Sequence, residues 1–193
     1  MTRLSVIAPC KDEELNLREL ARRVLVTFDA GGLDGELVLV DDGSTDGTWS
    51  GIEALVAEHP MRIVGRRHAR NAGIAASWRT GVAAARGELV AIMDADLQYA
   101  PEDLLRLLRE RESHGVDVVQ GFRSPVGRER GGRYWLSRGL NALLNATFGM
   151  RLRDNKSGFL VCRREVLADL LTFRQPYAYW QTFIMVAAHA KGY

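Results

Sequence analysis

The feature that most constrains the fold is a short apolar run, residues 89–93, that ends directly in two aspartates, Asp94 and Asp96. Such a run is typical of a strand in a parallel sheet that is covered on both faces. Ligands of open α/β sheets bind at the edge where such strands end. Residues two positions apart on extended backbone project to the same side, with Cα atoms roughly 6–7 Å apart. The stretch therefore predicts a carboxylate pair that can hold a divalent cation and its phosphates.

The segments around this strand alternate between strand and helix patterns. Apolar runs predict strands over residues 4–8, 36–40, 62–65, 89–93 and 117–121. Helical spacing of apolar residues predicts helices over 13–30, 49–60, 71–86 and 101–114. We expect Pro9 to stop the first strand. The regular alternation predicts an α/β fold, a mostly parallel, doubly wound and Rossmann-like sheet with helices on both faces.

The pattern changes after residue 122. An amphipathic helix is expected over 134–148, a late strand over 157–162 and a short helix over 164–171. The apolar tail 177–190 would suit a core helix, an interface or a membrane surface. Residues 123–156 hold eight Lys or Arg against two acidic residues, although the whole chain carries only +2. This segment favours an anionic partner, namely nucleic acid, membrane or a phosphorylated substrate.

The composition of the chain narrows the kinds of protein and of partner that are possible. The 193 residues, 47% hydrophobic and 26% charged, predict a soluble globular protein of one domain, or of one domain with an appendage. We see neither a secretory signal pattern nor an apolar run of about 18 residues, so we expect a cytoplasmic protein that lies on membranes instead of crossing them. Aromatic residues are sparse in the basic segment and no nucleic-acid motif occurs, so nucleic acid is not an expected partner. Cys10 and Cys162 are expected to be buried free thiols, and the four histidines, which share no metal-ligand spacing, to be surface residues.

Three predicted strands end in acidic residues. Asp41 and Asp42 follow one strand, Glu13 lies shortly after the first, and Asp94 and Asp96 follow the strand at 89–93. Carboxylates gathered at one edge repel each other unless a cation or hydrogen-bond donors lie between them. A nucleotide with its bound metal supplies both, so the edge is a candidate nucleotide site.

Four motifs in this order resemble the inverting glycosyltransferases of family 2, which have the GT-A fold. They are Val6-Ile7-Ala8-Pro9-x-x-Asp12-Glu13, Val40-Asp41-Asp42-Gly43-Ser44-x-Asp46-Gly47-Thr48, Asn71-x-Gly73 and Asp94-Ala95-Asp96. Later segments look most like polyprenyl-phosphate sugar transferases of the dolichol-phosphate mannose synthase type; these are Asp94-Ala95-Asp96-Leu97-Gln98 with Pro101-Glu102, Gly121-Phe122-Arg123, Ser137-Arg138-x-x-Asn141 and Asp154-x-x-Ser157-Gly158-Phe159.

The resemblance implies an enzyme that moves a hexose from a nucleotide-diphosphate sugar, of the GDP-mannose or UDP-glucose type, to a polyprenyl or dolichyl phosphate. It implies Mg²⁺ or Mn²⁺ as cofactor and a peripheral position on the inner, cytoplasmic face of the membrane. Residues 1–122 would form the donor-binding half. Residues 123–193 would form the acceptor-side and membrane-surface region of the same GT-A domain, without the C-terminal extension of the family. A membrane protein or a second copy of the chain stays open as a partner.

The resemblance also implies roles for particular residues. The implied catalytic residues are Asp94, Asp96, Asp154, Arg123 and Arg138, the two arginines holding the donor diphosphate or the lipid phosphate. The implied donor-binding residues are Pro9, Lys11, Glu13, Leu39, Asp41, Asp94, Ala95 and Asp96. The implied metal ligands are Asp94, Asp96 and Gln98, and the implied acceptor pocket is Ser157, Gly158 and Phe159.

One departure from the family pattern, the role of one residue and two alternative functions stay open. Lys11 stands where the family often has an aromatic residue, which leaves the base, guanine or uracil, undecided. Asp154 stands where relatives place a general base, but a lipid phosphate is already anionic and needs none. One alternative is therefore a sugar-hydroxyl acceptor, as in polysaccharide or glycolipid assembly. The other is a non-catalytic regulator that binds nucleotide-sugars.

Overall fold

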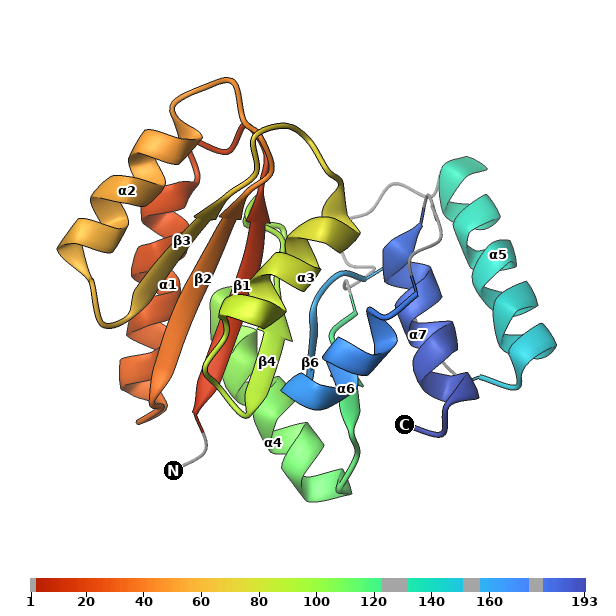
Figure 1. The fold of residues 1–193 in the computed structure, drawn as a ribbon. Coiled ribbons are helices and arrows are strands. Elements are labelled where there is room, and N and C mark those ends of the chain that lie inside the picture. The colour runs from red at the N-terminus through yellow and green to blue at the C-terminus, as the bar shows by residue number, and fades with distance from the viewer. Residues whose placement is uncertain (1–2, 123–131, 151–156, 174–178) are drawn as a thin grey trace.

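The computed structural model describes residues 3–122, 132–150, 157–173 and 179–193. Within these ranges the chain forms a six-stranded sheet with helices on both faces (Figure 1). The strands are β1 (Leu4–Cys10), β2 (Gly35–Asp41), β3 (Ile63–Arg67), β4 (Leu89–Ile92), β5 (Val118–Gln120) and β6 (Leu160–Arg163). The helices are α1 (Leu17–Ala30), α2 (Thr48–Glu58), α3 (Ile74–Ala84), the 3-10 turn η1 (Pro101–Asp103), α4 (Leu104–His114), α5 (Gly132–Phe148), α6 (Arg164–Leu170) and α7 (Trp180–Ala190).

The strand order is β3-β2-β1-β4-β6-β5. Strands β1 to β4 pair in parallel, whereas β6 runs antiparallel to both of its neighbours, β4 and β5. The predicted α/β fold with a mostly parallel sheet is confirmed, with β6 as its antiparallel member. Because β2, β1 and β4 are parallel neighbours, their carboxyl ends meet at the same edge of the sheet.

Two apolar clusters cover the two faces of this sheet. Helices α1, α2 and α4 bury one face, where Phe28 and Phe159 are among the large enclosed side chains. Helices α3, α6 and α7 bury the other, around the fully enclosed Trp78. The tail for which the sequence left three options open thus contributes a core helix, since Trp180 and Ile184 of α7 are buried.

The prediction that Pro9 stops the first strand is wrong. Strand β1 continues to Cys10, and Pro9 pairs in register with Val40 of β2. Proline is disfavoured inside sheets because it has no N–H group to donate. The carbonyl of Cys10 accepts from the N–H group of Asp42 on the β2 side, and the carbonyl of Ile7 accepts from the N–H group of Met93 on the β4 side. Backbone groups alternate between the two sides along a strand, so those of Pro9 face β4. The pairing of β1 with β4 ends at Ile7, before Pro9. The missing N–H group therefore removes no ladder bond.

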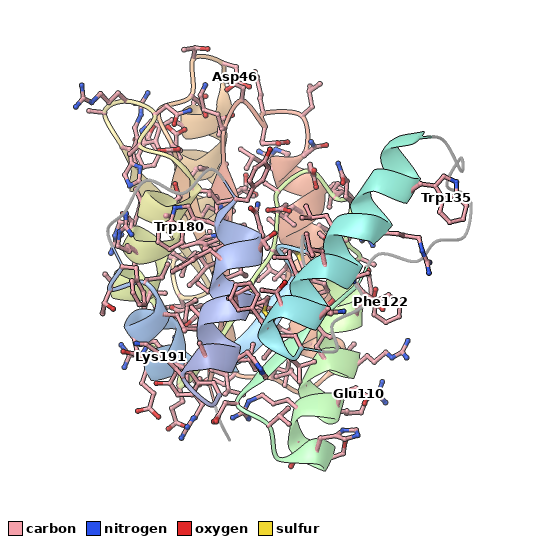
Figure 2. All side chains as sticks on the ribbon, turned by 90° about the vertical axis from the view of Figure 1, so that its right-hand side faces the viewer. Asp46, Glu110, Phe122, Trp135, Trp180 and Lys191 are labelled. Atoms are coloured by element: carbon pink, nitrogen blue, oxygen red, sulfur yellow. The ribbon has the colours of Figure 1, made fainter. Side chains whose placement is uncertain are left out.

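Helix α5 lies at the far end of the molecule, beyond α7 (Figure 1). Its large apolar side chains Trp135, Leu140, Leu143 and Phe148 are exposed, and Phe122 is exposed nearby. Figure 2 shows Trp135 projecting away from the body of the molecule, on the same side as Phe122. Among the residues that the structure describes, no helix is long and apolar enough to cross a membrane.

Candidate active site

A cavity of about 300 Å³ lies at the carboxyl edge of β2, β1 and β4. Carboxylates from all three strand ends reach it, as the sequence predicted. Its lining residues are Pro9, Cys10, Lys11, Glu13, Asp42, Asn71, Gly73, Ile74, Ser77, Asp94, Ala95 and Asp96.

The loop after β1 is held by reciprocal bonds to the loop after β2. Asp12 has a left-handed backbone, with φ of 56°, and its N–H group donates to Ser44 Oγ at 2.9 Å. Its Oδ1 accepts from the N–H group of Thr45 at 2.8 Å. The N–H group of Glu13 donates to Thr48 Oγ1 at 2.8 Å. These bonds fix the loop that carries Lys11 and Glu13 into the cavity.

Lys11 also pairs with the carboxylate of Asp12, its neighbour in the chain. This hydrogen bond, together with the one from the N–H group of Thr45, lowers the pKa of Asp12 to about 2. Asp12 is therefore ionised at neutral pH. The Lys11 side chain is partly exposed, so its ammonium group can reach an anion in the cavity without leaving water completely.

The two aspartates after β2 have different environments. Asp41 is fully buried, accepts from the N–H group of Ser44 at 2.9 Å, and has Arg67 Nε 3.1 Å from its Oδ2. That contact has ion-pair distance but lacks hydrogen-bond alignment, so Oδ2 is an acceptor without an aligned donor among the described residues. Asp42 instead lines the cavity and binds the N–H groups of Ala72 and Gly73 at 2.8 and 2.9 Å.

The turn after β4 presents Asp94 and Asp96 to the same cavity. The N–H group of Gln98 donates to Asp96 Oδ1 at 3.0 Å, and Leu97 between them has a left-handed backbone with φ of 59°. Gly158, which precedes β6, packs against Asp94: a Cβ atom there would lie 3.1 Å from Asp94 Oδ2. A residue with a side chain at position 158 would therefore crowd this carboxylate.

The residues just before β6 are buried next to the cavity wall that Asp94 forms. Ser157 is fully buried, its Oγ accepts from the N–H group of Phe159 at 3.2 Å, and its carbonyl accepts from Gln120 Nε2 at 2.9 Å. The Phe159 ring is buried against Tyr99, with the ring centroids 5.3 Å apart. Of the three predicted acceptor residues, Ser157 and Phe159 are thus core residues, and Gly158 is the one that packs against Asp94.

The other predicted site residues lie apart or outside the described ranges. Leu39 is buried in the core between β2 and its helices, and neither it nor Asp41 is among the lining residues. Arg138 is exposed on α5. Arg123 and Asp154 fall outside the residues that the structure describes.

The predicted donor set omitted six residues that also line the cavity, namely Cys10, Asp42, Asn71, Gly73, Ile74 and Ser77. Asp42 could have been found, since it follows the same strand as Asp41, and Asn71 and Gly73 form one of the four family motifs. The other three belong to no motif that the sequence offered. Burial, followed by the carboxylates of Glu13 and Asp41, raises the pKa of the Cys10 thiol. The thiol is therefore neutral at pH 7 and is a wall of the cavity, not a nucleophile. Both cysteines are free and buried, as predicted.

The donor atoms fit a hard divalent cation. Asp94 and Asp96 offer carboxylate oxygens into one cavity, and oxygen ligands favour Mg²⁺ or Mn²⁺. Within the described residues no group of three His, Cys, Asp or Glu side chains could enclose a metal. The two aspartates would thus supply part of the coordination shell, and phosphate oxygens or water the rest. The predicted third ligand, Gln98, is exposed and is not among the lining residues.

Two solved structures illustrate the fold that the chain shares with known proteins. The mannosyltransferase PcManGT of Pyrobaculum calidifontis, in complex with GDP-Man and Mn²⁺, matches with a TM-score of 0.68 and 23% identity over 94% of this chain and 50% of that chain. Glucosyl-3-phosphoglycerate synthase of Mycobacterium tuberculosis, in complex with UDP, matches with a TM-score of 0.70 and 24% identity over 99% of this chain and 66% of that chain. This likeness shows the fold, which is the GT-A fold.

The chain belongs to glycosyl transferase family 2, whose model matches residues 5–171. It is 34% identical to the undecaprenyl-phosphate 4-deoxy-4-formamido-L-arabinose transferase of Pseudomonas paraeruginosa over 186 residues, which are 96% of this chain and 53% of that protein. It is 32% identical to the dolichol-phosphate mannosyltransferase of Pyrococcus furiosus over 173 residues, which are 86% of this chain and 47% of that protein. The predicted family is confirmed, and the chain spans about half the length of these curated relatives.

Proposed function

We propose that the chain is the catalytic domain of a metal-dependent, inverting glycosyltransferase that transfers a hexose from a nucleotide-diphosphate sugar to a polyprenyl phosphate. The observation that carries this proposal is the cavity into which three neighbouring strand ends bring the carboxylates of Glu13, Asp42, Asp94 and Asp96. The names of the relatives support the lipid acceptor, since they are transferases acting on undecaprenyl phosphate and dolichol phosphate.

The donor half of the site would be residues 1–122. Glu13 and Asp42 in the cavity can accept from ribose hydroxyls and from N–H groups of the base. Asp41, fully buried beside Asp42 in the chain, would support this set by holding the loop after β2 through the N–H group of Ser44. Lys11 at the cavity supplies a positive charge for a phosphate. The donor would be of the GDP-mannose or UDP-glucose type.

Asp94 and Asp96 would hold Mg²⁺ or Mn²⁺ against the donor diphosphate. When bound, such an ion neutralises the diphosphate leaving group and acts as a Lewis acid. The turn of residues 94–98 keeps both carboxylates aimed into the cavity, so little reorganisation is needed when the leaving group gains charge. Gln98, exposed at the end of this turn, is a proposed outer ligand.

The acceptor would approach from the side of Gly158 and residues 123–193. A phosphate oxygen of the lipid attacks the anomeric carbon of the sugar and forms the new bond. The bond between that carbon and the diphosphate oxygen breaks, and the nucleoside diphosphate leaves. The attacking oxygen is already anionic, so no general base is needed. We propose that Arg123 and Arg138 hold the lipid phosphate or the diphosphate, and that Asp154 positions the acceptor.

We also propose that the domain lies on the inner, cytoplasmic face of the membrane. The exposed apolar side chains of α5 and the basic residues of the 123–156 segment support this position, because apolar and cationic groups together bind anionic lipid surfaces. A membrane protein or a second copy of the chain is a further proposed partner.

The test is a transfer assay with radiolabelled GDP-mannose and UDP-glucose, a polyprenyl phosphate and Mn²⁺. Asp96→Asn keeps the volume of the side chain but removes its charge, and we expect at least a hundredfold loss of transfer. The matched control, Asp34→Asn, lies at the opposite edge of the sheet and is expected to keep full activity. Full transfer by Asp96→Asn would refute the proposed site.

The same assay separates the alternatives. Donor hydrolysis without transfer to lipid, together with loss of transfer to a sugar hydroxyl in Asp154→Asn, would favour the hydroxyl acceptor. Nucleotide binding without any turnover would favour a regulator that binds nucleotide-sugars.

A further inference from the structure

One wall of the cavity is formed by a segment without regular secondary structure. Residues 68–73 connect the end of β3 to the start of α3, and Asn71 and Gly73 of this segment line the cavity together with Ile74 and Ser77 of α3. An irregular segment has no ladder of backbone bonds to fix its position. Contacts with side chains of neighbouring segments must therefore fix its middle, between the backbone bonds at its two ends.

The main contact is the carboxylate of Asp42. Its Oδ1 accepts from the N–H group of Ala72 at 2.8 Å, and its Oδ2 accepts from that of Gly73 at 2.9 Å. The carbonyl of Gly73 in turn accepts from the N–H groups of Ala76 and Ser77 in the first turn of α3. The carboxylate at the end of β2 thus holds the segment at two adjacent N–H groups, and Asn71 Oδ1, 3.0 Å from the Gly73 nitrogen, is a second acceptor for one of them.

His68 holds this carboxylate from behind. Its Nδ1 lies 2.7 Å from Asp42 Oδ1, and its Nε2 lies 2.8 Å from Thr80 Oγ1 on α3. The backbone N–H group of His68 donates to the carbonyl of Asp41 at 2.8 Å. With a proton on Nδ1 the ring satisfies both side-chain partners, since Nδ1–H donates to Asp42 and Nε2 can accept from the Thr80 hydroxyl. The side chain is 16% exposed, so the expectation of a surface residue is wrong for His68.

We propose that His68 is a positioning residue for donor binding. It does not line the cavity itself; it fixes the rotamer of Asp42, which holds the 71–73 segment as the cavity wall. A charge-assisted hydrogen bond is among the stronger contacts a side chain makes, and two partners leave the imidazole little freedom. That the cavity binds the donor rests on the proposed function, whereas the link from His68 to the segment does not.

The first experiment needs no ligand. Amide hydrogen exchange at Ala72 and Gly73 is measured in the wild type, in His68→Asn and in His68→Gln. The Asn amide can take the place of Nδ1 beside Asp42, whereas the Gln amide reaches the place of Nε2 beside Thr80. We expect protection of both amides in the wild type and in His68→Asn, and about tenfold faster exchange in His68→Gln. Equal protection in both variants would overturn the proposal.

The second experiment measures GDP and UDP binding by calorimetry with Mn²⁺, and donor KM and kcat in the transfer assay. We expect His68→Gln to weaken nucleotide binding and raise donor KM about tenfold, with kcat within about twofold of the wild type. His68→Asn should bind as the wild type does. The control, His114→Ala, changes an exposed histidine on α4 and should change nothing.

The outcomes keep the two ideas apart. A wild type that binds neither nucleotide refutes the proposed function, and the exchange data then decide the role of His68 alone. A wild type that binds, with His68→Gln binding equally well, refutes the positioning role and leaves the proposed function standing. A fall in kcat without a change in KM would also refute the positioning role, because it would point to a direct part in the chemistry.

Discussion

Asp12 connects the two loops that frame the cavity. A left-handed backbone is uncommon for residues other than glycine, and asparagine and aspartate adopt it more readily than most others. Here the conformation lets Asp12 bond both Ser44 and Thr45 of the neighbouring loop. The residue therefore acts on the site through the placement of Lys11 and Glu13, its neighbours in the chain.

We predict that Asp12→Ala weakens nucleotide binding about threefold or more, because alanine neither favours this backbone nor accepts from Thr45. Asp12→Asn keeps both properties and is expected to bind nearly as the wild type does. Calorimetry with GDP and UDP measures both variants, and Glu53→Ala on the exposed face of α2 is the control. Equal affinity in Asp12→Ala and the wild type would contradict this role.

Glu36 is a buried carboxylate at the edge of the sheet opposite the cavity. It accepts from Ser5 Oγ at 2.6 Å and from the N–H group and the side chain of Arg86, also at 2.6 Å. Burial by itself disfavours the charge, but the hydrogen bonds from Ser5 and Arg86 outweigh it and lower the pKa of Glu36 below its usual value. The network joins β1, β2 and the turn before β4 at their starting ends.

The pKa of Glu36 is lower in the folded protein than in the unfolded chain, where it is about 4.5, so its ionised form stabilises the fold. This contribution to the free energy of unfolding is complete above about pH 4.5 and is lost as the pH falls through the pKa of the folded state. We predict that Glu36→Gln costs about 2 kcal/mol at pH 7, since the amide cannot accept from both donors of Arg86. Its unfolding free energy should also change less than that of the wild type between pH 5 and pH 3. Urea unfolding at these pH values is the measurement, with Glu53→Gln as the exposed control.

At the scale of the elements, helix packing decides whether alanine in place of a helix glycine stabilises or destabilises the fold. Gly81 of α3 lies against β1, and a Cβ atom there would be 2.2 Å from Ile7 Cγ2. A Cβ atom at Gly139 of α5 would have no atom within 4 Å among the described residues, apart from the backbone of its own helix. Both glycines are interior helix positions, where propensity alone favours alanine by about 1 kcal/mol.

We therefore predict opposite effects for the same substitution. Gly81→Ala should destabilise the protein by about 1–3 kcal/mol through overpacking against Ile7. Gly139→Ala should be neutral or stabilise by up to about 1 kcal/mol. Chemical unfolding of the two variants is a matched comparison, and stabilisation by both substitutions would show that helix propensity, not packing, controls these positions.

The sheet shows how far element-level patterns reach. The apolar runs predicted the strands and their order of appearance, because each is bounded by turn residues and separated by a helical pattern. They did not indicate that β6 is inserted antiparallel between β4 and β5, since a strand near the end of the chain can pair with any open edge. This insertion brings Gly158 next to Asp94.

At the scale of the whole molecule, α5 carries four of the large exposed apolar side chains, Trp135, Leu140, Leu143 and Phe148, and Phe122 is exposed on the same side as Trp135 (Figure 2). A group of large exposed apolar residues marks an interaction surface more often than a free one. We predict that Leu143→Glu weakens sedimentation with phosphatidylglycerol vesicles about tenfold, because one buried leucine contributes roughly 1.5–3 kcal/mol.

Leu15→Glu is the matched control for that experiment. Leu15 is 94% exposed and lies two residues before α1 in the chain. Helices α1 and α5 lie at opposite ends of the molecule (Figure 1). Leu15→Glu should bind vesicles as the wild type does. Equal loss in both variants would mean that charge, and not the α5 surface, governs binding.

The sequence by itself determined the fold class, the family and the acidic pair Asp94 and Asp96, because local patterns and ordered motifs encode them directly. Tertiary structure alone decided that Asp42 lines the cavity while Asp41 is buried, and that His68 holds Asp42. The physical reason is that adjacent residues after a strand point to different surroundings, and which of them reaches the cavity depends on neighbours 26 to 31 positions away along the chain.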